Sequence, residues 1–345
     1  MSCYNPLRAK ILGIDSNGKK ILKIIPASDF KEDDSSYISL PCGRCIGCRL
    51  KYSRQWADRC MAEASYHDSN VFLTLTYNDE HLPDRLVKEV DVYDEDGDYV
   101  STSKELSPFH PLVKRDLQLF IKRLRKRFPE THIRYFACGE YGPTTHRPHF
   151  HLLLFGLRLP DLQYFKTDSE GHVFSTSETI KELWYRECDK GVQDIGQRSA
   201  GFHIISDVNW STCAYVARYI MKKQFGQNSD IYEKLNFPPE FTLMSRRPGI
   251  GRQYYEDHAK DIYFSDSYLR TDKGAVLIRP NKYYDSLFDI DYPDIMPGIR
   301  VERQEFAKVD NALKSNLTSL DFLSRLKSEE TDLEARTRAL KRKEL

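Results

Sequence analysis

One stretch of the chain, residues 147–155, constrains the fold more than any other. It reads Arg-Pro-His-Phe-His and then continues as an unbroken run of Leu and Phe. Such a run predicts a β-strand buried on both faces. Because side chains alternate along a strand, we expect His149 and His151 on one face and Phe150 on the other. Two such imidazoles can bind one divalent ion, although an isolated His-x-His is more often a pair of ordinary hydrogen-bonded strand histidines.

A second strand is predicted just upstream, over residues 133–142, and it carries Glu140 near its end. If the two strands form a hairpin, Glu140 lies beside the two histidines. Two imidazoles and one carboxylate with open coordination positions suit Mg²⁺ or Mn²⁺ better than a closed structural zinc site. His149, His151 and Glu140 are therefore the predicted ligands of a catalytic ion.

A helix is predicted over residues 214–223, with its N-terminal cap at 209–211 and its stop at Gly226. Tyr215 and Tyr219 lie one turn apart on one face, and Lys222 shares that face. A phenol with a pKa of about 10 is a poor nucleophile, but a lysine and a metal-polarised phosphodiester would both assist its attack. The alternative is an amphipathic helix that simply buries two tyrosines.

The order of these motifs resembles the HUH endonucleases of the rolling-circle replication initiator (Rep) superfamily. In that family a hydrophobic residue separates the two metal-binding histidines, and the nucleophilic tyrosine follows them, whereas in relaxases the tyrosines come first. The resemblance covers about residues 70 to 225, including a first motif at 72–77. The chain as a whole is most similar to the initiators of gokushovirus-type microviruses, which are single-stranded DNA phages, and this similarity also draws on residues 1–54 and the loop 244–251.

The resemblance implies a rolling-circle DNA replication initiator that nicks and rejoins origin DNA through a covalent 5′-phosphotyrosine. It implies that Tyr215 and Tyr219 act in alternation and that Lys222 steadies the phosphate or exchanges its proton. The expected partners are single-stranded origin DNA, the double-stranded replicative form, and the host helicase and replication machinery. Three alternatives stay open: a transposase or plasmid initiator with the same chemistry, a zinc-bearing nucleic-acid-binding protein without catalysis, and a Mg²⁺-dependent nuclease that uses water.

A cysteine cluster near the N-terminus predicts a second metal site. Cys42, Cys45 and Cys48 form two overlapping Cys-x-x-Cys spacings, which suggest structural zinc. Cys3 is the candidate fourth ligand, and three unliganded thiols at a tight glycine turn are the alternative. The chain has no apolar run long enough to cross a membrane and no signal-peptide core, so we expect it in the reducing host cytoplasm, without disulfides.

The formal net charge of +1 does not by itself indicate a nucleic-acid-binding protein, but basic residues gather in two places. A helix over residues 111–128 combines an apolar stripe with a nearly acid-free basic face, and an Arg/Gly loop spans 244–252. Both could contact DNA phosphates, and a solvated helix face and a flexible surface loop are the alternatives. The candidate DNA-binding residues are Lys122, Arg123, Arg125, Lys126, Arg246, Arg247 and Arg252.

These elements predict an α+β fold with a central antiparallel sheet, the metal site on its central strands and the tyrosine helix across one face. We expect three parts: an N-terminal segment with a hairpin, the cysteine cluster and a helix (1–68), the nickase domain (69–260), and a C-terminal extension with a charged helix and a tail (261–345). Further predicted elements are a hairpin within 9–26, a helix at 50–66, a strand at 71–77, an inserted hairpin within 85–107, a helix at 176–188, a strand at 201–208, and a solvated helix from 301 with a loose basic tail at 336–343.

Overall fold

The computed structural model describes residues 3–15, 20–26, 29, 34, 36–169, 171–219, 230–271 and 274–339. The chain divides into two compact units, one formed by Met1–Tyr52 with Asn281–Leu345 and the other by Ser53–Pro280. The first unit thus joins the two ends of the chain. The division into three consecutive parts stays a prediction. Within the described part of the chain, no helix combines the length and the hydropathy needed to cross a membrane.

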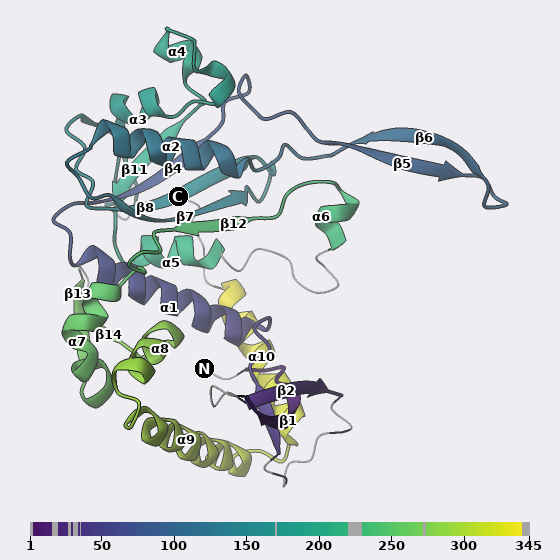
Figure 1. Cartoon of the computed structure of the whole chain (residues 1–345), viewed down its shortest axis with the longest axis vertical. Helices are drawn as coiled ribbons and strands as arrows, with labels where there is room; N and C mark the ends of the chain where they lie inside the picture. The colour runs from purple at the N-terminus through teal and green to yellow at the C-terminus, as the bar shows by residue number, and fades with distance from the viewer. Residues whose placement is uncertain are drawn as a thin grey trace. The chain divides into compact units, whose positions relative to one another are not determined.

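The larger unit is built on an antiparallel sheet, as the sequence predicts (Figure 1). In the described residues this sheet has seven strands in the order β12-β7-β8-β4-β11-β10-β9. The histidine strand β8 lies inside the sheet, paired with β7 on one side and β4 on the other. The strands are β4 (Asn70–Thr76), β7 (Arg134–Tyr141), β8 (Pro148–Phe155), β9 (Leu162–Thr167), β10 (Val173–Ser177), β11 (His203–Asp207) and β12 (Phe241–Met244).

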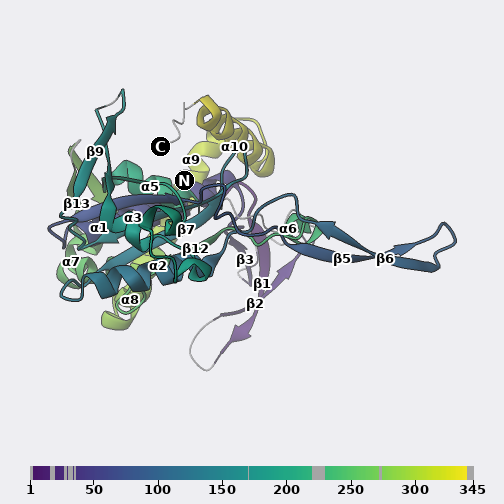
Figure 2. The same ribbon diagram turned by 90° about the horizontal axis from the view of Figure 1, so that it is seen from above.

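Helices cover both faces of this sheet, which explains why the run in β8 is apolar at every position. Phe150, Leu152 and Leu154 pack in one core cluster with the apolar stripe of α2 (Lys114–Arg127). Leu153 and Phe155 pack in the other cluster with α5 (Trp210–Tyr219) and the second half of α1 (Ile46–Ala64). Figures 1 and 2 show α2 and α5 on opposite sides of the sheet. The predicted strand buried on both faces is confirmed.

The helix predicted over residues 176–188 is wrong in its bounds. Residues up to Ser177 belong to β10, because β9, a strand that the sequence analysis does not foresee, pairs with them. The Ser177 hydroxyl then accepts the N–H of Ile180 and caps a short helix, α3 (Glu178–Leu183). A 3₁₀ turn at Glu187–Asp189 follows. The other elements of this unit are α4 (Ile195–Arg198), α6 (Asp230–Lys234), α7 (Arg252–Phe264), β13 (Ser267–Thr271) and β14 (Gly274–Ile278).

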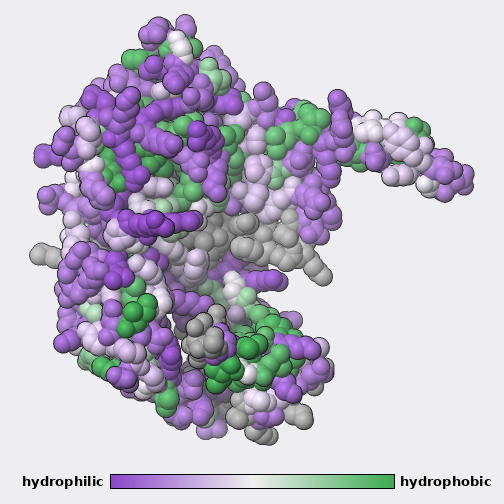
Figure 3. All heavy atoms as spheres, viewed as in Figure 1, coloured by the Kyte–Doolittle hydropathy of each residue, from purple (hydrophilic) through white to green (hydrophobic). Residues whose placement is uncertain are grey.

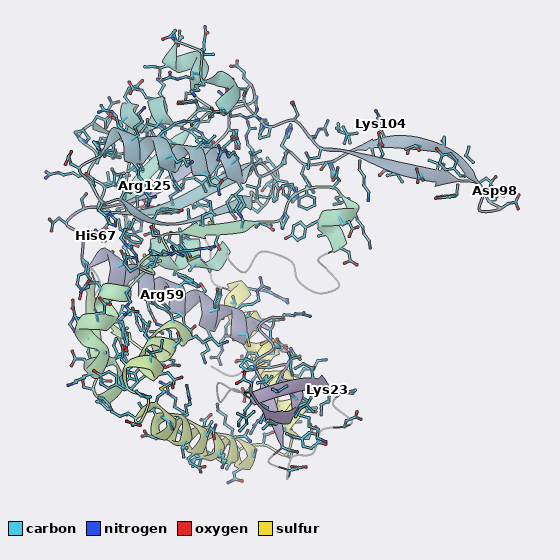
Figure 4. The ribbon with its side chains drawn as sticks, in the orientation of Figure 1. Lys23, Arg59, His67, Asp98, Lys104 and Arg125 are labelled. Atoms are coloured by element: carbon cyan, nitrogen blue, oxygen red, sulfur yellow. The ribbon has the colours of Figure 1, made fainter. Side chains whose placement is uncertain are left out.

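The inserted hairpin is confirmed as a two-stranded sheet of its own, formed by β5 (Val87–Tyr93) and β6 (Tyr99–Leu106). It projects away from the seven-stranded sheet in both ribbon views (Figures 1 and 2). Asp98 lies at its tip and Lys104 along β6 (Figure 4), and the tip is covered by hydrophilic residues (Figure 3). The Asp94 carboxylate accepts the N–H groups of Asp96 and Asp98, so these acidic residues shape a turn.

The smaller unit contains a three-stranded antiparallel sheet and the C-terminal helices. The predicted N-terminal hairpin is confirmed as β1 (Leu7–Ile14) and β2 (Lys20–Ile25), and β3 (Tyr37–Leu40) pairs with β1. The helices are α8 (Lys282–Asp291), α9 (Met296–Asn316) and α10 (Phe322–Ala339). The prediction of a loose tail from Arg336 is wrong at its start, because α10 continues there and Arg336 pairs with Asp332.

A buried ion pair anchors the Arg/Gly loop of the larger unit. Glu63 of α1 contacts Arg134 of β7, and each side chain is only 7% exposed. The second carboxylate oxygen of Glu63 accepts the N–H of Gly251 at 2.7 Å. Arg134 in turn donates to the carbonyl oxygens of Pro248 and Gly249 at 2.9 and 3.1 Å. The alternative of a flexible surface loop therefore does not hold for its C-terminal half.

Three donors act on the Glu63 carboxylate and set its charge state. Burial alone would raise the pKa of Glu63, but hydrogen bonds from His67, the Gly251 N–H and Arg134 hold it below its ordinary value of 4.5. A carboxyl group whose pKa is lowered by folding stabilises the folded state above its ordinary pKa. That contribution is lost as the pH falls through the lower pKa of the folded state.

We predict that Glu63→Gln lowers the free energy of unfolding by about 3 kcal/mol at pH 7, because Arg134 is left as a buried charge without its counter-charge. Urea unfolding of the full chain, followed by fluorescence, measures the difference. The gap between the wild type and the variant should shrink below pH 4.5, where the wild-type carboxylate also becomes protonated.

The matched control is Glu256→Gln, which removes an exposed i,i+4 partner of Arg252. A surface pair of this kind contributes about 0.5 kcal/mol or less, so the control should unfold nearly as the wild type does. If Glu63→Gln is as stable as the control at pH 7, the buried pair does not anchor the loop.

Candidate functional site

The register of β7 on β8 brings Glu140 and the two histidines together. Glu140 is paired with His149, and Cys138 is paired with His151. Glu140 Oε1 lies 2.7 Å from Nε2 of His151, and both side chains are buried. The two imidazole rings are nearly parallel, with 7° between their planes and 6.5 Å between their centroids. The predicted placement of these three side chains on one face of a hairpin is confirmed as geometry.

Neighbouring groups hold each histidine in a defined orientation. Nδ1 of His149 lies 2.6 Å from the carbonyl oxygen of Arg147. Because a carbonyl can only accept, Nδ1 carries the proton and Nε2 keeps its lone pair. Burial also lowers the pKa of His149, which favours the neutral ring that a metal ligand needs. Nδ1 of His151 lies 2.9 Å from Oγ1 of Thr74, a partner that appears only once β4 is known to pair with β8.

The three residues fit a divalent ion by donor type and by the tautomer of His149, but they are not drawn tightly together. Glu140 and His151 are in direct contact, while His149 lies one pleat repeat away along β8. In the described residues, the four clustered cysteines alone form a group of three or more possible ligands whose atoms all lie within 4.8 Å of one another. The donor set of two imidazoles and one carboxylate is one that suits Mg²⁺ or Mn²⁺ with open positions.

Helix α5 brings Tyr215 onto the histidines. Its start is fixed by a reciprocal cap, since the Asn209 side chain accepts the N–H of Thr212 and the Thr212 hydroxyl accepts the N–H of Asn209, both at 2.9 Å. Val216 and Ala217 are fully buried against the sheet. The half-buried ring of Tyr215 stands perpendicular to His151, with 5.2 Å between the ring centroids.

The other two predicted catalytic residues lie at or beyond the edge of what the structure describes. Tyr219 is the last residue of α5, and only its backbone is described. Lys222 and the predicted stop at Gly226 lie outside the described residues. The geometry therefore joins one of the two tyrosines to the histidine strand.

The basic residues of α2 are not brought to this site. Lys122, Arg125 and Lys126 are exposed, but α2 covers the sheet face opposite to α5. Figure 4 labels Arg125 on α2 and Arg59 on α1, on opposite sides of the sheet. Arg123 is largely buried and donates to the carbonyl oxygens of Leu183 and Tyr185, so its guanidinium holds the chain after α3.

The Arg/Gly loop lies on the same sheet face as α5. Ile250 is fully buried in the core cluster that contains Val216. Arg246 and Arg247 are exposed, and Arg252 is half-buried with its Nε 2.6 Å from a carboxylate oxygen of Glu256. Arg246 and Arg247 therefore sit, on an anchored loop, on the face that carries the histidines.

The cysteine cluster of the smaller unit gathers all four predicted ligands. The sulfur atoms of Cys3, Cys42, Cys45 and Cys48 lie within 4.8 Å of one another, and those of Cys3 and Cys45 are 3.9 Å apart. A tetrahedral zinc ion with Zn–S bonds of about 2.3 Å sets its sulfurs about 3.8 Å apart, so the spacing fits. Cys60, which the sequence makes a poorer candidate, belongs to the core of the larger unit.

Backbone N–H groups prepare Cys45 as a thiolate. The N–H groups of Tyr4 and Cys48 point at its sulfur, at 3.3 and 3.5 Å. Burial alone would raise the pKa of Cys45, but hydrogen bonds from these two N–H groups bring it down to about 7. Since zinc is bound by the thiolate form, this favours a metal ligand.

The chain is similar to replication proteins of several small phages. One protein family, that of the replication-associated protein ORF2, matches residues 70–224. The Replication-associated protein ORF2 of Spiroplasma virus 4 is 33% identical over 321 residues, which cover 89% of this chain and 87% of that protein. The Replication-associated protein VP4 of Bdellovibrio phage phiMH2K is 27% identical over 301 residues, covering 85% and 79%.

A shorter match joins the chain to the Replication-associated protein ORF4 of Chlamydia phage 1, at 29% identity over 192 residues, or 53% of this chain and 38% of that protein. No solved structure matches the chain.

Proposed function

Because this chain belongs to the family of replication-associated proteins of microvirus-like phages, we propose that it initiates rolling-circle replication by nicking and rejoining one strand of origin DNA. The proposed enzyme is a metal-dependent HUH-type endonuclease and strand transferase, with the fold of that class. Its substrates would be single-stranded origin DNA and the double-stranded replicative form, in the host cytoplasm. The host helicase and replication machinery would act with it.

The observation that carries this proposal is the convergence of three distant chain segments on one point. Glu140 of β7 contacts His151 of β8, and Tyr215 of α5 stands 5.2 Å from the same histidine, measured between ring centroids. A carboxylate and two imidazoles can bind a divalent ion, and a phenol beside them is a nucleophile within reach of a phosphate held there. Packing alone does not require a hydroxyl-bearing ring at this position.

The proposed reaction is a transesterification that conserves bond energy. The Tyr215 oxygen attacks the scissile phosphorus, the bond from phosphorus to the 3′ oxygen breaks, and the 5′ phosphate becomes linked to the tyrosine. The phenolic proton is lost and the departing 3′ oxygen takes up a proton, so the reverse attack by a 3′ hydroxyl rejoins a strand without ATP. A Mg²⁺ or Mn²⁺ ion held by His149, His151 and Glu140 would polarise the phosphate and stabilise charge on the leaving oxygen.

The second tyrosine gives the proposed cycle its two steps. Tyr219 follows Tyr215 by one helical turn, so it could cleave the regenerated origin while the first tyrosine still holds the old 5′ end. Lys222 would steady the phosphate or exchange the proton. Arg246 and Arg247 would contact the DNA backbone on the same sheet face, while Lys122, Arg125 and Lys126 would contact DNA away from the cleavage point.

Two of the alternative functions are less well supported. A transposase or plasmid initiator would use the same chemistry, but the similarity to phage proteins extends over most of this chain and of its relatives. A nuclease that uses water would need no tyrosine at the histidines, whereas Tyr215 contacts His151 edge to face.

We predict that the full-length protein forms a covalent adduct with single-stranded DNA when Mn²⁺ or Mg²⁺ is present. The substrates are labelled oligonucleotides tiled over the genome that encodes the chain, and the adduct is read on a denaturing gel. Replacing both Tyr215 and Tyr219 by Phe should reduce the adduct by about a thousandfold or more, because both proposed nucleophiles are gone. Each single variant should retain nicking.

Tyr164→Phe is the matched control, because Tyr164 is an exposed tyrosine on β9 and should not affect the adduct. Cleavage without an adduct would replace the proposal by a hydrolytic nuclease. Binding of DNA with neither cleavage nor adduct, across the whole tiled set, would favour the non-catalytic binding protein.

We also propose that Cys3, Cys42, Cys45 and Cys48 bind one structural zinc ion. The site would tie the N-terminus to two further parts of its own unit. Tyr4 and Cys45 pack in a small core cluster with Leu326 of α10, and Phe322 and Leu333 of the same helix pack against it. Loss of the metal should therefore loosen α10 as well as the N-terminal strands.

We predict one zinc ion per chain by elemental analysis of protein purified without chelator. Cys45→Ser should lower zinc affinity by tenfold or more, since one of about four ligands is lost. Limited proteolysis should then cut within the first 48 residues and within α10. Cys188→Ser, at an exposed cysteine outside the cluster, is the control and should keep the zinc. A wild-type protein without zinc, and with α10 equally protected, would contradict the proposal.

A further inference from the structure

A row of three side chains crosses the sheet beside the candidate site. His149 of β8 is paired with Thr76 of β4, and the N–H of Thr76 donates to the carbonyl oxygen of Phe202 at 2.9 Å. Paired residues on neighbouring strands point to the same face of a sheet, so Phe202 shares the face of the histidines. At about 4.8 Å per strand spacing, it stands roughly 10 Å from His149.

Phe202 borders a groove at the end of these strands. The groove has a volume of about 510 Å³ and is lined by Thr76, Tyr77, Asn78, Asp79, Glu80, Arg147 and Phe202. Phe202 is 72% exposed, although it lies next to the buried β11. A groove of this size is in the range that holds one small organic ligand.

The backbone beneath Phe202 is rigid, so its ring is presented in a fixed place. Gly201 has a φ of +150°, and a Cβ there would lie 2.3 Å from the backbone nitrogen of Asn78. The chain can pass this close to β4 only with glycine. The N–H of Asn78 also donates to the carbonyl oxygen of Ala200 at 2.8 Å, so hydrogen bonds hold the segment on both sides of Gly201.

The polar groups of the groove suit a base rather than a phosphate. Asp79 and Glu80 are exposed carboxylates, which would repel a phosphate but can accept hydrogen bonds from an amino group. Arg147 donates to the Tyr77 carbonyl oxygen at 3.0 Å and pairs with Asp79 at 2.6 Å, which holds that side of the groove in shape. Adenine, cytosine and guanine carry an exocyclic amino group, and thymine does not.

We infer that this groove binds one unpaired base of the DNA strand that is cleaved, stacked on Phe202, and that it prefers a base with an exocyclic amino group. The inference rests on the proposed function, because it takes the strand to run past His149. Base–aromatic stacking is the usual means by which proteins hold single strands. A base fixed roughly 10 Å from His149 would set which phosphate reaches the metal ligands.

The experiment measures binding without cleavage. Fluorescence anisotropy follows the full-length protein on labelled 20-mers of dA, dC and dT, with no divalent metal added. The wild type should bind dA and dC more tightly than dT. Phe202→Ala should weaken binding to dA and dC by about 5- to 100-fold, the usual effect of removing one stacking ring, and Phe202→Trp should restore it.

Phe165→Ala is the matched control, since Phe165 is an exposed aromatic residue on the edge strand β9 and should leave all three affinities unchanged. Replacing both Asp79 and Glu80 by Ala should reduce the ratio of dC to dT affinity.

Two results would overturn the inference. One is unchanged binding of Phe202→Ala to all three strands, including the case in which the variant instead alters self-association in sedimentation. The other is equal wild-type affinity for dA, dC and dT, which would remove the base preference. Failure of the proposed nicking function is read separately, by the absence of a covalent adduct while binding still depends on Phe202.

Discussion

The pairing of β7 with β8 is the constraint on which the candidate site depends. Phe136, Cys138 and Glu140 alternate on one face of β7, opposite Leu153, His151 and His149 of β8. The first two pairs lie in the core beneath α1 and α5, so burial of Phe136 and Leu153 fixes the register. A slip of one residue would move Glu140 to the other face of the sheet. The same packing that folds the sheet therefore places the carboxylate beside the imidazoles.

The sequence predicts much of this site because alternation and helical period are local properties. They place His149, His151, Glu140 and Tyr215 on defined faces before any tertiary contact is known, and the structure agrees. They do not say which face of the sheet a helix covers. The basic helix α2 has a clear apolar stripe, yet it packs on Phe150 and Leu152, away from the histidines. Nor does a basic run distinguish the largely buried Arg123 from its exposed neighbours Lys122 and Lys126.

Contacts between distant residues explain what the sequence alone does not give. Three of the clustered cysteines come from one turn and are readable as a spacing, whereas the Glu63 network joins residues 71 and 188 positions apart. No periodicity connects Glu63 to Arg134 or to Gly251. Strand β9 was missed for a related reason, since all its residues are exposed and its place depends on pairing with β10. Without that pairing, residues 176 and 177 have no reason to leave a helix.

The two halves of the candidate site are positioned by different forces. Glu140, His149, Thr76 and Phe202 occupy paired strands or their direct extension, so ladder hydrogen bonds fix their spacing. Tyr215 instead depends on how closely α5 approaches the sheet. The residues of α5 that face the sheet, Cys213, Val216 and Ala217, are small and fully buried, and they let the helix lie close to β8. Bulkier side chains there would lift the phenol away from His151, so the small residues of the core belong to the chemistry as much as the tyrosine does.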